Sequence, residues 1–225
     1  MLAIATYNVL ADAYIRREFY PRTEPALLRP GARDAALIER IRGFDADVIC
    51  LQEVEQRLMD AIGLPGEFVH KAGGKPDGCA TFVRGEARHE ALHFDDGTGH
   101  LVLITRAAGV TIANTHIKWD AKWGVGQAEA IVRALASHPR PWIVCGDFNA
   151  EPDSSVLSVF RDFVDAHPVS VCTCNSNGRA KKIDYILATR ELSASPIASP
   201  IVTDDTPLPS ALEPSDHVSL RAIFR

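Results

Sequence analysis

The chain has 225 residues, 46% of them hydrophobic, and a formal net charge of -5 at pH 7. This length and composition can bury one substantial core, and no linker interrupts the sequence, so we expect a single domain over residues 1–225. An acidic chain does not coat long nucleic acid by charge alone, because that mode of binding needs a basic face. A nucleic-acid enzyme stays compatible with this charge, because a metal site gathers acidic residues and bound cations offset them.

Five cysteines are present, and three of them, Cys50, Cys79 and Cys145, lie in apolar runs where a small buried thiol is ordinary. Cys172 and Cys174 lack a second pair at zinc-finger spacing, which favours free thiols in a reducing compartment over a structural zinc site. The first residues contain no basic leader followed by a long apolar core, and no apolar run reaches membrane-spanning length. We therefore predict a cytoplasmic protein that does not enter a membrane.

The beginning of the sequence predicts two strands separated by a helix. Alternating apolar residues indicate a strand over residues 2–9, with Asn8 at or near its end. Helical spacing of apolar residues after a Pro-Gly breaker predicts a helix over residues 33–44. The apolar run 48–51 predicts a buried strand that delivers Glu53 just beyond its carboxyl end.

Between residues 66 and 110, short apolar stretches alternate with Gly- and Asp-rich turns, which predicts an antiparallel meander. Its strands are expected at residues 68–71, 79–84 and 101–105. Residues 110–116 predict a further strand that ends at His116, and residues 127–137 have the spacing of a helix. A polar side chain thus again follows an apolar strand.

Residues 142–149 are the most informative stretch, because an apolar strand is broken there by glycine and followed by Asp147 and Asn149. Alone, an Asp-x-Asn pair after a strand is as consistent with a plain turn as with a functional site. A helix with an Asp or Ser cap is predicted over residues 154–163. The last predicted strands cover residues 182–187 and 217–224.

Polar side chains at the ends of predicted apolar strands recur along the whole chain. They are Asn8, Glu53, His116, Asp147, Asn149, Asp184, Asp216 and His217. Open α/β sheets bind their ligands just beyond the carboxyl ends of strands, where such side chains emerge. Their oxygen atoms suit Mg²⁺ or Mn²⁺ better than zinc. Phosphoester hydrolysis needs a divalent ion, a base for water and donors for the developing charge, and this set can supply all three.

Seven short segments occur in an order that resembles a known superfamily. They are residues 7–10 (Tyr-Asn-Val-Leu), 51–55 (Leu-Gln-Glu-Val-Glu), 77–82 (Asp-Gly-Cys-Ala-Thr-Phe), 114–120 (Asn-Thr-His-Ile-Lys-Trp-Asp), 146–149 (Gly-Asp-Phe-Asn), 183–186 (Ile-Asp-Tyr-Ile) and 215–217 (Ser-Asp-His). Together they resemble the endonuclease/exonuclease/phosphatase superfamily, and most closely its branch of deadenylases, nocturnin and the Angel proteins. The resemblance implies a four-layer α/β sandwich, in which two packed mixed sheets are flanked by helices.

The resemblance also implies roles for the polar residues. Glu53 would be a principal metal ligand, with Asn8 close beside it and Asp216 binding or approaching the metal. Asp147 would orient or deprotonate the attacking water, and Asn149 would hold a phosphoryl oxygen.

Two histidines complete the implied centre. His116 and His217 would donate to the scissile phosphate and stabilise the charge of its transition state. Asp184 would accept a hydrogen bond from His217 and fix its ring, which also follows from chemistry, because a carboxylate beside an imidazole favours the imidazolium and sets its orientation.

Four further residues are predicted substrate contacts, each with a structural alternative. Lys118 and Trp119 follow the strand that ends at His116, where the indole could stack on a base or cover a sheet edge. Arg179 and Lys182 could meet phosphates at the rim or form a solvated basic turn.

These observations predict a Mg²⁺- or Mn²⁺-dependent hydrolase of phosphoesters, with single-stranded RNA or a small nucleotide as substrate and no obligate protein partner. The first hypothesis is a 3′-to-5′ exoribonuclease. The second is a phosphatase that removes a terminal 2′, 3′ or 2′,3′-cyclic phosphate. Residues 172–180 contain no aromatic side chain of the kind thought to stack on adenine in deadenylases, so poly(A) specificity is not implied. A DNA- or lipid-directed member and a non-catalytic binding module are the remaining alternatives, and the intact polar positions argue against the module.

Overall fold

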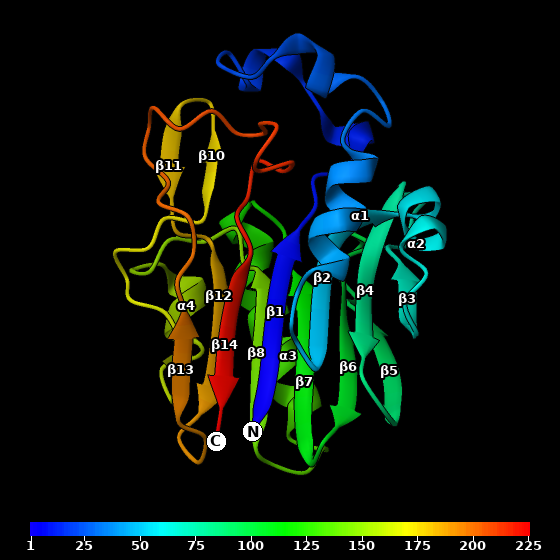
Figure 1. Ribbon diagram of the computed structural model, residues 1–225. Helices are drawn as coiled ribbons and strands as arrows, with labels where there is room; N and C mark the ends of the chain where they lie inside the picture. Colours follow the sequence, from blue (N-terminus) through cyan, green and yellow to red (C-terminus); the bar gives the residue numbers. More distant parts are fainter.

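The computed structural model describes residues 1–225 and consists of two six-stranded β-sheets that pack face to face (Figure 1). The first sheet has the order β13 (Ala194–Ile197), β14 (Leu220–Phe224), β1 (Leu2–Asn8), β2 (Val48–Glu55), β4 (Asp77–Val83), β3 (Gly66–His70). The second has the order β5 (Ala87–His93), β6 (Leu101–Ala107), β7 (Val110–His116), β8 (Trp142–Asp147), β12 (Asp184–Thr189), β9 (Phe163–Asp165). A hairpin of β10 (Cys174–Ser176) and β11 (Arg179–Lys181) stands apart from both.

Helices cover the outer face of each sheet. In the first sheet these are α1 (Asp34–Arg42) and α2 (Gln56–Ile62), whose Leu37, Ile41 and Leu58 pack on β1, β2 and β4. The second sheet is covered by α3 (Ala121–Leu135) and the one-turn α4 (Ser155–Ser158). Apolar residues of β1, β2 and β14 meet those of β7, β8 and β12 between the sheets. The predicted four-layer α/β sandwich is therefore confirmed.

Pairing at the centre of the second sheet places three predicted site residues side by side. β8 is parallel to β7 and antiparallel to β12, and Asp147 is paired with His116 on one side and with Asp184 on the other. In the first sheet β1 runs parallel to β2, and Asn8 is paired with Gln52. The ends of these strands meet at one end of the sandwich, below the N-terminal segment 9–33 and the β10–β11 hairpin at the top of Figure 1.

Gly146 is required where β8 approaches β7. Its φ is +136°, and a Cβ atom there would lie 1.9 Å from the carbonyl oxygen of Thr115. Only glycine fits this close approach of two backbones. The broken apolar run of the sequence therefore marks the point at which Asp147 enters the site.

Residues 66–110 do not form the predicted single meander. β3 and β4 pair in the first sheet, whereas β5 and β6 pair in the second. The prediction was wrong because strand patterns and turn residues mark where strands end but not which sheet they join. The mostly exposed, polar strand β5 was also missed, since it lacks the apolar alternation of a covered strand.

Two helices differ in length from their predictions. The helix predicted over 154–163 is only α4, although Ser154 caps it by accepting from the Leu157 N–H at 3.3 Å. Beyond the end of the helix, Phe160 packs edge-on against buried Phe148 and against partly buried Phe163. In contrast, α3 begins six residues before position 127, because Asp120 caps it. No helix has the length and apolar composition to span a membrane.

Candidate active site

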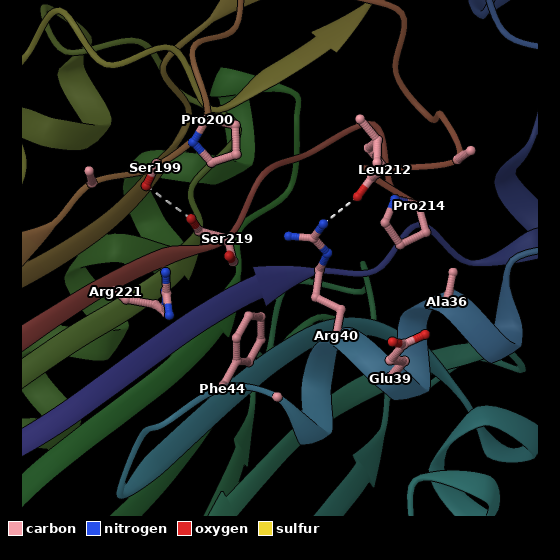
Figure 2. Close-up of a pocket in the computed structure, with 13 residues that line it drawn as sticks. Ala36, Glu39, Arg40, Phe44, Ser199, Pro200, Leu212, Pro214, Ser219 and Arg221 are labelled. Atoms are coloured by element: carbon pink, nitrogen blue, oxygen red, sulfur yellow. Dashed lines mark hydrogen bonds between the residues drawn. The ribbon is translucent and has the colours of Figure 1, made fainter.

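The predicted polar residues surround one cavity of about 610 Å³ at the strand ends, which we call the active-site cavity. Six of the eight line it, namely Glu53, His116, Asp147, Asn149, Asp216 and His217, and Asn8 and Asp184 lie behind them in hydrogen-bond contact. A second cavity of about 720 Å³ lies on the outer face of the first sheet, between α1 and residues 198–214 (Figure 2). There Arg221 lies over Phe44 and Arg40 bonds the Leu212 carbonyl, but none of the predicted site residues is present.

Asn8 joins the carboxylates of the two sheets. Its side-chain nitrogen donates to Glu53 Oε1 at 3.1 Å and to Asp147 Oδ2 at 2.9 Å, and its oxygen accepts from the Leu10 N–H at 3.0 Å. Both ends of the amide are therefore used. In this orientation Asn8 positions the carboxylates, and it would have to turn its amide over to offer oxygen to a metal.

Glu53 reaches the cavity through a bulge inside β2 and not, as predicted, beyond the end of that strand. The pairing with β4 is irregular between Leu51 and Val54, and Glu53 itself has a φ of 57°. Because a non-glycine residue in this region is strained, the surrounding contacts must hold it. One such contact is the Ala11 N–H, which donates to Glu53 Oε2 at 3.0 Å.

The carboxyl groups of the cavity are suited to a hard divalent cation. Burial raises the pKa of Glu53, and nearby Asp216 raises it further against the opposing charge of Lys71. Burial raises the pKa of Asp147 to about 7, although His217 and the bond from Asn8 oppose this rise. Buried carboxylates crowded in this way gain from a bound cation, and Mg²⁺ and Mn²⁺ prefer oxygen ligands. The residues present therefore fit the predicted ion.

His217 is held as a cation. Its Nδ1 lies 2.8 Å from Asp184 Oδ2, which directs Nε2 toward Asp147 Oδ2 at 3.7 Å. Burial alone would lower the pKa of His217, but the carboxylates of Asp184 and Asp216 outweigh it, and the pKa lies well above its usual value. The predicted Asp184–His217 pair is thus present in the geometry.

His116 differs from His217 in its charge state. Burial and the adjacent Lys71 lower its pKa well below the ordinary value, so the ring is neutral. Its Nδ1 lies 3.1 Å from Lys71 Nζ, and its Nε2 lies 3.0 Å from the Asn149 side-chain nitrogen. A cationic and a neutral imidazole therefore flank Asp147.

Lys71 forms a buried ion pair with Asp77 at 2.5 Å, and their side chains are 2% and 0% exposed. We expect Lys71→Met to lower the free energy of unfolding by about 3 kcal/mol, because it leaves the Asp77 charge buried without its partner. Chemical denaturation measures this change. Lys75→Met, which removes a lysine of the same turn that has no ion pair, is the control. Equal stability of the Lys71→Met variant and the wild type would contradict the structural role of this pair.

The predicted substrate contacts divide into two groups. Lys118 and Trp119 line the active-site cavity, with Lys118 Nζ 5.4 Å from the centre of an indole that is 71% exposed. Lys182 does not reach the cavity, and its prediction as a phosphate contact is wrong, because the side chain is buried against Asp165 at 2.6 Å. Arg179 does not line the cavity either, because it pairs with Glu151 at 3.0 Å.

Several residues of the cavity were not predicted from the sequence. Tyr14 donates to Asp77 at 2.6 Å, Tyr20 donates to Asp216 at 3.0 Å, and His100 packs edge-on against His116. The signal for Lys71 was available, since it directly follows a short strand as the predicted residues do. No comparable signal exists for the two tyrosines, which come from an irregular segment.

The protein is thus a four-layer α/β sandwich with a cluster of carboxylates and histidines at one end of its two sheets. The model of the Endonuclease/Exonuclease/phosphatase family matches residues 5–217, so the chain belongs to that family. It is 27% identical over 200 residues to protein angel homolog 2 of Mus musculus, which covers 71% of this chain and 37% of the relative. It is 29% identical over 216 residues to 2′,5′-phosphodiesterase 12 of Bos taurus, covering 69% of this chain and 35% of the relative. The chain thus spans about a third of the length of these curated relatives.

Solved structures share the fold. The crystal structure of ANGEL2, a 2′,3′-cyclic phosphatase, in complex with adenosine-2′,3′-vanadate superposes with a TM-score of 0.75 at 19% identity, covering 99% of this chain and 95% of the other. The human nocturnin catalytic domain with bound sulfate gives a TM-score of 0.70 at 22% identity, covering 100% and 93%. At these identities the likeness supports the fold alone.

Proposed function

We propose that the protein is a divalent-metal-dependent hydrolase of RNA phosphoesters, and that residues 1–225 act as one catalytic domain. The observation that carries the proposal is the position of Asp147, which lies within 3.7 Å of the Nε2 atoms of both a neutral and a cationic histidine. It lies in the same cavity as Glu53 and Asp216. A base for water, donors for phosphoryl oxygens and ligands for a cation are thereby combined.

In the proposed mechanism each side chain of the active-site cavity has a distinct role. Glu53 and Asp216 would hold a Mg²⁺ or Mn²⁺ ion, which would supply positive charge beside the phosphoryl oxygens. Asp147 orients a water molecule and accepts its proton, since a pKa near neutrality suits a general base. The imidazolium of His217 donates to the phosphoryl group, and no covalent intermediate is needed.

The remaining groups position the substrate. The backbone N–H of Asn149 donates to Asp147 Oδ1 at 2.8 Å, and this bond fixes Asn149 beside the general base. Lys71 holds His116 at Nδ1, and when the substrate displaces the Asn149 amide from Nε2, this atom donates to a second phosphoryl oxygen. Lys118 and Trp119 at the rim contact the phosphate and base of the next nucleotide. Asn8 and Asp184 orient Glu53, Asp147 and His217 from behind.

We propose a 3′-to-5′ exoribonuclease as the first activity. The similarity to 2′,5′-phosphodiesterase 12 supports cleavage between nucleotides, and a cavity of about 610 Å³ has the size of a site for a small ligand. A terminal phosphatase is the second candidate, favoured by the likeness to a structure described as a 2′,3′-cyclic phosphatase. The same side chains serve both reactions.

Three RNAs of one sequence distinguish these activities. Each is 5′-labelled and ends in a 3′-hydroxyl, a 3′-phosphate or a 2′,3′-cyclic phosphate, and each is incubated with Mn²⁺ or EDTA. A ladder of shortened products that EDTA abolishes is the result expected of the exonuclease. Loss of only the terminal phosphate would assign the phosphatase instead. No change in any of the three would contradict action on RNA.

The cysteines indicate the cellular compartment of the protein. All five cysteines are free thiols, which supports a reducing compartment, and we propose the cytoplasm. Single-stranded RNA or a small nucleotide is the proposed partner of the active-site cavity.

A further inference from the structure

Cys174 is a residue of the active-site cavity that the proposed mechanism does not use. It lies in β10, its backbone forms a β-bridge with His217, and it lines the cavity together with Asp216. Two further bonds fix this arrangement, from the Asn175 N–H to the Asp216 carbonyl at 2.9 Å and from the Val218 N–H to the Thr173 carbonyl at 2.7 Å. The thiol is therefore held beside the catalytic histidine by paired backbone.

The side chains of Cys174, Asp216 and His217 converge. The sulfur, a carboxylate oxygen and a ring nitrogen all lie within 4.8 Å of one another, and Asp216 Oδ1 lies 3.8 Å from His217 Nε2. In a tetrahedral zinc site, with bonds of about 2.0–2.3 Å, ligand atoms are separated by roughly 3.3–3.8 Å. Small side-chain movements are thus enough to bring these three atoms onto one ion.

The nitrogen ligand His217 and the oxygen ligand Asp216 are each oriented by a hydrogen bond to a second residue, as ligands in protein metal sites commonly are. Asp184 lies 2.8 Å from His217 Nδ1 and leaves Nε2 directed at the cavity. Tyr20 donates to Asp216 Oδ2 at 3.0 Å and leaves Oδ1 on the side of His217. A carboxylate behind the imidazole fixes the tautomer and raises the basicity of the ligating nitrogen.

The thiol makes this set selective for soft cations. Mg²⁺ and Mn²⁺ prefer oxygen ligands, whereas zinc also binds thiolates and displaces the thiol proton when it binds. On binding, the protons of the thiol and of the imidazolium pass to solvent.

We propose that Cys174, Asp216 and His217 form a binding site for a thiophilic divalent cation such as Zn²⁺, and that occupation of this site inhibits the enzyme. The cation removes His217 from the phosphoryl group and Asp216 from the hard cation, so the two states exclude one another. The inhibitory part rests on the proposed function, whereas the binding site does not.

Cobalt tests the binding site without substrate. Co²⁺ added to the metal-free wild type is expected to give a thiolate-to-cobalt charge-transfer band in the near ultraviolet. Cys174→Ser should lose this band, and Cys172→Ser, which changes a partly exposed cysteine of the same segment outside the cluster, should keep it. Absence of the band in the wild type, or its persistence in Cys174→Ser, would overturn the proposal.

Zinc titration at fixed Mn²⁺ tests the inhibition. Half-inhibition of Cys174→Ser should need at least about tenfold more Zn²⁺ than the wild type, in line with the loss of one ligand, when each protein's activity is expressed relative to its own activity without zinc. Equal zinc sensitivity of the two proteins would contradict an inhibitory site that uses Cys174. If the wild type hydrolyses no RNA, the proposed function fails, and the cobalt spectra alone decide the binding site.

Discussion

Asp147→Asn is expected to reduce turnover by at least about 10²-fold, the lower range for loss of a general base, while the protein stays folded. The substitution keeps the shape of the side chain and removes its ability to accept a proton from water. Asp147 is the paired neighbour of both His116 and Asp184, so no other carboxylate takes the same position. Steady-state kinetics on the preferred RNA measures the change.

Asp153→Asn is the matched control for this prediction. Asp153 is an exposed carboxylate of the loop that follows β8, and it lines no part of the active-site cavity. The control variant should keep wild-type turnover. Near-normal activity of Asp147→Asn, with its circular dichroism spectrum unchanged, would remove Asp147 from the role of base.

Glu53→Gln is expected to raise the metal concentration for half-maximal activity by at least about tenfold. Removal even of a residue that only supports a metal ligand typically costs 10–100-fold in metal affinity or activity, and the loss of a direct ligand should cost no less. The amide keeps the volume of the side chain but removes its charge from the cavity. Turnover measured against Mn²⁺ concentration at saturating RNA gives this value.

Glu55→Gln separates this effect from a general loss of charge in β2. Glu55 lies two residues farther along and accepts from the Asp12 and Ala13 backbone N–H groups at the surface, outside the cavity. Its metal dependence should match that of the wild type. An unchanged metal dependence of Glu53→Gln would exclude Glu53 as a ligand.

The sequence predicts the centre well where strand pairing does the positioning. Asn8, His116 and Asp147 are each the last residue of their strands, and the parallel pairing of β7 with β8 brings two of them together. A rule that looks for polar residues at strand ends therefore finds them. It also finds Glu53, although a bulge that sequence patterns do not show is what turns this side chain into the cavity.

The same rule fails where a distant partner decides the position of a side chain. Lys182 was predicted at the rim because it belongs to a basic run, yet Asp165 and the carbonyl oxygen of His167 hold it in the interior. Tyr20 was missed because its hydrogen bond to Asp216 joins residues 196 positions apart. Such contacts depend on the folded chain and leave no periodic pattern in the sequence.

The central claim, a metal-dependent RNA hydrolase that uses Asp147, is tested most directly by one time course. The wild type and Asp147→Asn are incubated with a mixture of 5′-labelled RNAs carrying the three kinds of 3′ end, with Mn²⁺ or with EDTA. We predict products from the wild type with Mn²⁺, and almost none with EDTA or from the variant. Products that form equally in EDTA, or equally with Asp147→Asn, would contradict the proposed function.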